Sequence, residues 1–198
     1  HLRLKMPYDS LKDFVPIAQM NSFPQVVIVN PGVPAKSVKE LIALARARPG
    51  VLTYGSSGVG SAFHLAGELF ASMANVKMLH VPYKGGNLAL TDLVGGRIDV
   101  MFYSLAVALP QIKAGKVRAI AVTGLKHDAL MPELPTVDES GLRGYDITGW
   151  HGFFSYQTFI AASVLAAYPL LGVIRQTRAS VGDVLTQDYI RTARAKGV

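Results

Sequence analysis

Glycine and serine dominate the segment Tyr54–His64, which reads YGSSGVGSAFH. Glycine lets the backbone approach a ligand closely, and serine offers a hydroxyl group that donates and accepts hydrogen bonds. A helix is predicted to follow at Ala62–Met73, and the unpaired N–H groups at a helix N-terminus favour a carboxylate or a phosphate. The segment therefore predicts a loop that binds a small anion, although the same residue types also form ordinary turns and helix caps.

The segment Val81–Asn87 (VPYKGGN) has the same chemistry and lies at the next predicted connection between a strand and a helix. Its two glycines expose backbone amides, and Lys84 adds a cation that attracts anions. One such loop is weak evidence for a binding site. Two neighbouring loops in one sheet indicate a shared site for a small anion such as a carboxylate.

Catalytic sites need spacings that this chain does not have. A nucleophile elbow built on Ser57 requires a glycine two residues later, where the sequence has Val59. A dinucleotide fingerprint requires a third glycine at the position of Phe63. The chain contains no cysteine, and its histidines lack the spacing of metal ligands. We expect no catalysis, no cofactor and no metal; an α/β hydrolase that uses Ser57 and His64 is the least favoured alternative.

Strands and helices are predicted to alternate along the part of the chain that carries these loops. Apolar runs predict strands at 25–29, 51–54, 78–81, 98–102 and 118–122, and helical spacing predicts helices from 38 to Pro49 and at 62–73, 88–94 and 107–113. A second capping box, Thr136–Glu139, predicts a short helix closed by Gly141. This alternation predicts an α/β fold with a mostly parallel sheet flanked by helices, whose ligands bind beyond the carboxyl ends of the strands.

The formal net charge of +7 comes from scattered lysine and arginine residues. No basic stripe interleaved with aromatic residues accompanies it, so the charge favours a solvated surface that attracts small anions over a nucleic-acid interface. The absence of cysteine is compatible with an oxidising compartment. Since the chain opens on HLRLKMPYD, without a start methionine or a hydrophobic signal core, we expect a processed N-terminus or a fragment.

The sequence changes character at about Phe154. No residue from Phe154 to Ile174 is charged, and a segment of this length can cross a bilayer core of about 30 Å. A basic tail, 175–198, follows, and the positive-inside rule would place it in the cytoplasm. The segment 154–174 is therefore a predicted transmembrane helix that could anchor the chain in the inner membrane; the alternative is a buried core helix that ends at Pro169.

Six segments carry a family resemblance over residues 4–153: MPYDSLKDFVPIAQM, VIVNPGVPAKSVKELIALARARPG, LTYGSSGVGSAFHLAGELF, MLHVPYKGGNLALTDLVGGRIDVMF, ALPQIKAGKVRAIAVTG and LPTVDESGL-GYDITGWHGFF. In this order they resemble the Bug/TctC family, the extracytoplasmic solute receptors of tripartite tricarboxylate transporters. The elements S-S-G-x-G-x-x-x-H-L and V-P-Y-K-G-G, at this separation, are specific to the family.

The resemblance implies one lobe of a type 2 periplasmic-binding-protein-like clamshell. Residues 1–29 would be a remnant of the first lobe with a hinge strand, 30–146 the second, ligand-binding lobe, and 147–153 the return hinge. The hydrophobic helix 154–174 and the basic tail 175–198 would follow. A periplasmic location and membrane transporter subunits as partners are also implied.

The implied ligand is a small organic carboxylate or an acidic amino acid, held by backbone amides and small hydroxyl groups. The implied ligand-binding residues are Ser56, Ser57, Gly58, Gly60, Ser61, Tyr83, Gly85, Gly86 and Tyr103. His64 is expected to brace its own loop. Family members usually carry aspartate in place of Tyr103, so the selectivity of the family does not transfer to this chain.

Residues 160–198, which include IRQTRASVGDVLTQDYIRTARAKG, resemble permease subunits of dipeptide/oligopeptide ABC importers. Asp188–Gly197 would begin the cytoplasmic loop that engages the ATPase. Because the two resemblances belong to different importer classes, a gene fusion, a frameshift or an assembly artefact is expected more than a natural tethered receptor. The alternative function that follows is a non-binding, membrane-anchored permease fragment.

Overall fold

The strand β1 (Phe14–Val29) begins the ordered sequence of elements and contains the apolar run QVVIV. The residues of that run are all buried, as its β-branched composition predicts, but the strand begins at Phe14 and not at Gln25. The computed structural model of the chain describes residue 9 and residues 12–156. Contacts divide the chain into two compact units, Phe23–Gly149 and a second unit made of His1–Ser22 and Trp150–Val198.

The elements after β1 are α1 (Val38–Ala47), β2 (Thr53–Ser56), α2 (Ala62–Ala74), β3 (Leu79–Pro82), α3 (Gly86–Val94), β4 (Val100–Ser104), α4 (Leu105–Lys113), β5 (Arg118–Val122) and β6 (Thr148–Tyr156). From α1 to β5 the elements alternate as the sequence predicts, with most boundaries shifted by a few residues, and β6 follows β5 without a helix between them. In the described part of the second unit, the side chain of His151 bonds Asn21 Oδ1 at 2.9 Å.

The sheet has the strand order β3-β2-β4-β1-β5, with β6 paired to β1. Strand β2 runs parallel to β3 and β4, whereas β1 runs antiparallel to both β4 and β5. The prediction of a mostly parallel sheet is therefore wrong in one respect, and the sheet is mixed. Strands β2 to β5 share one direction because helices connect them in sequence, but β1 precedes the first helix and lies between β4 and β5.

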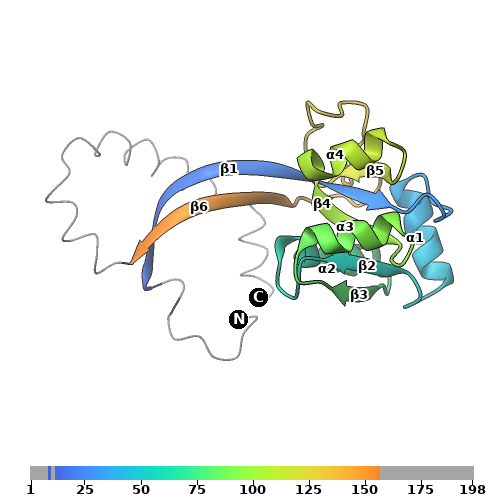
Figure 1. Cartoon of the computed structure of the whole chain (residues 1–198), viewed down its shortest axis with the longest axis horizontal. Coiled ribbons are helices and arrows are strands. Elements are labelled where there is room, and N and C mark those ends of the chain that lie inside the picture. The colour runs from blue at the N-terminus through green and yellow to red at the C-terminus, as the bar shows by residue number, and fades with distance from the viewer. Residues whose placement is uncertain (1–8, 10–11, 157–198) are drawn as a thin grey trace, which may run out of the picture. The chain divides into compact units, whose positions relative to one another are not determined.

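Helices cover both faces of the sheet within Phe23–Gly149, as Figure 1 shows. Helices α1 and α2 pack with Val27, Tyr54 and Phe102 in one core, and α3 and α4 pack with Ile28 and Met101 in the other. Successive residues of β1 face opposite cores, as the two-residue period of a strand requires. These two cores fix the strands whose ends carry the candidate site.

Two predicted helices differ from the structure. The box at Thr136 forms, since Glu139 N donates to Thr136 Oγ1 and Thr136 N to Glu139 Oε1. However, Thr136 makes an isolated β-bridge with Val122, and residues 137–141 form turns. Gly141, at a φ of 121°, ends this turn before a helix can propagate.

The helix predicted at 154–174 does not begin at Phe154, because Phe154, Ser155 and Tyr156 belong to strand β6. An uncharged run does not distinguish a strand from a helix when its period is unclear. The rest of that prediction, and the tail 175–198, lie outside the described residues. Among the residues described, no helix has the length and apolar character needed to cross a membrane.

Candidate functional site

Three strands end at one edge of the sheet, the carboxyl edge, and each leads directly into a helix. Strands β2, β3 and β4 end at Ser56, Pro82 and Ser104, and the N-termini of α2, α3 and α4 therefore lie at the same edge. Helix α2 is capped by Ser61 Oγ, whereas Gly85 and Ser104 make no side-chain cap for α3 and α4. Free N–H groups and aligned helix dipoles at one edge favour an anion.

The first predicted loop, Ser56–Ser61, is held by hydrogen bonds of its own. Ser56 is fully buried, and its Oγ lies 3.1 Å from both Gly58 N and Gly58 O and 2.7 Å from His80 Nε2. A hydroxyl group has one proton and two lone pairs, so these contacts use all of its capacity. Ser56 therefore stabilises the conformation of the loop, and its hydroxyl group has no hydrogen bond left for a ligand.

His64 holds the other end of this loop, as the sequence predicts. Gly60 N donates to His64 Nδ1 at 3.2 Å, and His64 N donates to Ser61 Oγ at 3.3 Å. Gly58 and Gly60 have φ angles of 123° and 79°, which residues with side chains rarely adopt. The glycines are thus required by the path of the backbone.

Ser57 is the predicted residue of this loop with a free side chain. It is half-buried, and its hydroxyl group makes no hydrogen bond to any residue that the structure describes. The N–H groups of Ala62 and Phe63, in the first turn of α2, have no partner within their helix. These groups offer hydrogen bonds to a ligand.

The hydroxyl group of Tyr83, in the second predicted loop, is hydrogen-bonded to helix α3. This group donates to Asp92 Oδ2 at 2.8 Å, and Asp92 Oδ1 accepts from Arg97 Nη1 at 2.7 Å. Burial, followed by the bond to Asp92, raises the pKa of Tyr83 to about 12. Hydrogen bonds from Arg97 and Tyr83 lower the pKa of Asp92. The Tyr83 hydroxyl group therefore stays protonated and anchors the loop.

Tyr103 lies at the end of β4 and is almost fully buried. Its hydroxyl group donates to Asn87 Oδ1 at 2.8 Å, and its ring packs edge-on against Phe63 at 4.9 Å between centroids. Burial raises the pKa of Tyr103. A Cβ atom on Gly86 would overlap the Tyr103 ring, so the glycine allows α3 to start against it.

Gln25 and Ser104 lie at the same edge and were not predicted as site residues. They are opposite each other in the antiparallel pair of β1 and β4, which brings their side chains to one face. Gln25 is fully buried, and neither of its amide atoms has a hydrogen-bond partner in the described part of the chain. In the sequence, the polar Gln25 at the start of the apolar run QVVIV was the one signal of a site residue. Its position opposite Ser104 depends on the register of β1, which was not predictable.

The charge at this edge is positive or neutral. The loops at 56–61, 82–86 and 103–104 contain Lys84 and no aspartate or glutamate. Within the described residues no cluster of histidine and carboxylate side chains could hold a metal ion. The arrangement can bind an anion by amides and hydroxyl groups, without a formal ion pair to a buried arginine.

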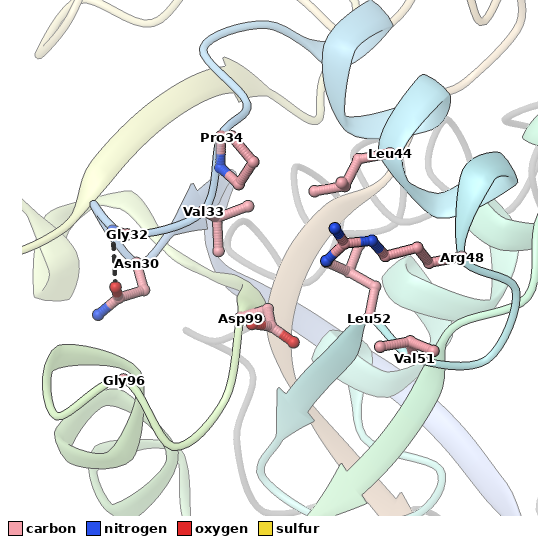
Figure 2. Close-up of a pocket in the computed structure, with 10 residues that line it drawn as sticks. All are labelled: Asn30, Gly32, Val33, Pro34, Leu44, Arg48, Val51, Leu52, Gly96 and Asp99. Atoms are coloured by element: carbon pink, nitrogen blue, oxygen red, sulfur yellow. Dashed lines mark hydrogen bonds between the residues drawn. The ribbon is translucent and has the colours of Figure 1, made fainter.

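A cavity of about 340 Å³ lies at the opposite, amino edge of the sheet (Figure 2). Arg48 at the C-terminal end of α1 points into it, and Asn30 and Asp99 line its other sides. Asp99 Oδ2 accepts from Thr53 N at 2.8 Å and from Thr53 Oγ1 at 2.7 Å, and Asn30 Nδ2 donates to Leu93 O at 2.7 Å. The side chains of Asp99 and Asn30 thus tie the segments beside the strands to Thr53 of β2 and to Leu93 of α3.

In sequence, residues 1–164 match the family described as tripartite tricarboxylate transporter family receptor. A Pseudomonas sp. (strain P51) protein, the UPF0065 protein in the tcbD-tcbE intergenic region, is 40% identical over 152 residues, which cover 76% of this chain and 45% of that protein. Protein BugT of Bordetella pertussis is 32% identical over 145 residues, 73% of this chain and 44% of BugT. The chain spans less than half the length of these relatives.

Solved structures show the same fold. Rpa4515 of R. palustris with adipate is 36% identical with a TM-score of 0.73, over 81% of this chain and 55% of that one. MatC from Rhodopseudomonas palustris with bound malate is 27% identical with a TM-score of 0.75, over 96% of this chain and 62% of that one. The predicted α/β fold of the periplasmic-binding-protein type is confirmed.

The C-terminal resemblance is supported over a short segment. The oligopeptide transport system permease protein AppB of Bacillus subtilis is 52% identical over 42 residues, which cover 21% of this chain and 13% of AppB. A match of this length supports a likeness of the segment alone. It does not show a permease fragment, a gene fusion or an anchor in the membrane.

Proposed function

This chain belongs to the tripartite tricarboxylate transporter family of receptors, and from that premise we propose that it binds a small organic carboxylate at the carboxyl edge of its sheet. The observation that carries the proposal is the convergence of three helix N-termini, two without a side-chain cap, on an edge with no acidic residue in its loops. A carboxylate there would accept hydrogen bonds from backbone amides, and Ser57 would donate another.

The ligand class follows from the site and from the similar structures. Dicarboxylates are favoured because the proteins of known structure carry adipate and malate. The loops that contain Ser57 and Gly58 would hold one carboxylate group, and Gly85 and Gly86 would bring the second loop close to it. Tyr83 and Tyr103 would act through packing, since Asp92 and Asn87 occupy their hydroxyl groups.

The wider role of the chain is part of the same proposal. Residues 30–146 would form the second, ligand-binding lobe, 1–29 a remnant of the first lobe with the hinge strand, and 147–153 the return hinge. The protein would act in the periplasm, present its ligand to membrane subunits of a tripartite uptake system, and catalyse no reaction. The likeness of residues 1–164 to the receptor family supports each of these statements.

Calorimetric titration of the full chain with adipate and with malate tests the proposal. We expect saturable binding of at least one of the two, and about a tenfold weaker affinity in Ser57→Leu, because the larger side chain removes a hydroxyl group and fills the loop. Ser72→Leu is the matched control, since Ser72 is exposed near the other end of α2. Absence of binding, or equal affinities in both variants, would overturn the proposal.

A further inference from the structure

Two histidine rings lie beneath the Ser56–Ser61 loop and contact it at both ends. The rings of His64 and His80 are 4.1 Å apart between centroids and tilted by 35°. His80 bonds Ser56 Oγ through Nε2 at 2.7 Å, at the start of the loop. His64 accepts from Gly60 N through Nδ1 at 3.2 Å, near its end.

The donor at Gly60 fixes the protonation state of His64. A backbone N–H can only donate, so Nδ1 must offer a lone pair and the ring proton must lie on Nε2. That nitrogen is 3.9 Å from Glu68 Oε1, which is the correct side for an N–H group. A charged His64 would carry protons on both nitrogens and could not accept from Gly60.

The surroundings of the pair come from three elements. Tyr54 of β2 stacks on His80 at 4.9 Å and bonds Glu68 of α2 through its hydroxyl group. Ser56 Oγ is saturated when His80 donates to it, because Gly58 N and Gly58 O take its remaining positions. Burial, and then the neighbouring His64 ring, lower the pKa of His80, so the His80 ring stays neutral.

We propose that His64 and His80 are positioning residues that hold the Ser56–Ser61 loop in its binding form, and that protonation of His64 releases Gly60 and weakens carboxylate binding. This inference rests on the proposed function. In acid the Gly60 amide loses its acceptor, and a new charge appears beside the His80 ring. Receptor and ligand would then separate more readily at low pH.

The test compares His64→Asn with His64→Leu in the full chain. Asparagine keeps an acceptor near the position of Nδ1 and does not titrate, whereas leucine removes the acceptor. For the unmodified chain we expect the affinity for adipate or malate to fall about tenfold from about pH 7.5 to about pH 5. His64→Asn should lose most of that difference, and His64→Leu should bind about tenfold more weakly than His64→Asn at the higher pH. Protonation of the ligand is common to all three proteins and cancels.

Amide hydrogen exchange of the free protein supplies a readout that needs no ligand. In the unmodified chain the Gly60 amide should lose protection in acid, after correction for the intrinsic rate, while His64→Asn keeps it. Normal binding with an identical pH profile in His64→Asn would overturn the inference and leave the proposed function intact. If neither acid binds at any pH, the proposed function fails, and unchanged exchange at Gly60 would then overturn the inference separately.

Discussion

The two edges of the central sheet both carry polar groups, but they use them in opposite ways. At the amino edge, Asp99 and Asn30 spend their side-chain hydrogen bonds on Thr53, Leu93 and Gly32, and the space between them is a cavity. At the carboxyl edge, Ser57 and the starts of two helices have polar groups without partners among the described residues.

A cavity and a binding site are therefore separate properties of this fold. A cavity arises wherever turns fail to fill the space between a helix and a sheet. A binding site needs polar groups that the fold leaves unsatisfied and keeps in place, because their hydrogen bonds are then available to a ligand. Arg48 does not reverse this comparison, because a cation at the C-terminal end of α1 also interacts favourably with the helix dipole.

Among these substitutions, Gly60→Val should have the largest effect on carboxylate affinity, and should show that binding depends on the carboxyl edge. Valine at a φ of 79° cannot keep the path of the loop, so carboxylate affinity should fall at least about a hundredfold, or about 2.7 kcal/mol. Gly115→Val, at a φ of 67° beyond the end of α4, imposes similar strain away from the carboxyl edge. Calorimetry should find normal affinity in that control; an equal loss in both would contradict the contrast.

Asp99→Ala tests the amino edge by its effect on stability. The substitution removes two hydrogen bonds from Thr53 and leaves its N–H group without this acceptor, so the free energy of unfolding should fall by about 2 kcal/mol. Denaturant unfolding measures this loss, and carboxylate affinity should change less than about twofold. Asp128→Ala, which removes one bond to Leu130 N in an exposed turn, should cost much less. A large loss of affinity in Asp99→Ala would show that the amino edge contributes to binding.

Gln25→Leu tests whether the buried side-chain amide of Gln25, at the carboxyl edge, lacks hydrogen-bond partners. Removing a buried amide without a hydrogen-bond partner should raise the free energy of unfolding by about 1 kcal/mol. Thermal and denaturant unfolding measure the change, with Gln111→Leu on α4 as the control expected to stay near zero. A loss of stability in Gln25→Leu would instead show that this amide is satisfied in solution.

The smallest expected effect is on the acid dependence of stability, through the hydrogen bonds of Asp92 with Tyr83 and Arg97. Because Arg97 and Tyr83 hold the pKa of Asp92 below its ordinary value, their bonds stabilise the fold at neutral pH. That contribution is lost as the pH falls below about 4 and through the lowered pKa. Arg97→Gln should therefore flatten this acid dependence in unfolding measurements below about pH 4. An unchanged slope would show that the ion pair does not contribute.

Much of the fold was predictable from local patterns. Helix α1 begins after the Ser37 cap, and α2 follows its glycine loop, because capping and apolar spacing act within a few residues. Strand β5 has the predicted bounds, Arg118–Val122. Gly58 and Gly60 have positive φ angles, a conformation that the residue types allow and that the sequence pattern alone did not predict. The ligand-binding roles given to these loops stay predictions.

Local patterns in the sequence were enough to predict the helices and strands between Gln25 and Val122 and the loops that carry amides and hydroxyl groups. Only the tertiary structure decided that β1 runs antiparallel between β4 and β5, and thereby that Gln25 faces Ser104. The tertiary structure also places His80 in hydrogen-bond contact with the Ser56 hydroxyl group and Asp92 in hydrogen-bond contact with that of Tyr83. The Ser57 hydroxyl group has no such partner among the described residues. The reason is that propensity and capping depend on near neighbours, whereas the satisfaction of a buried polar group depends on residues that the fold brings together.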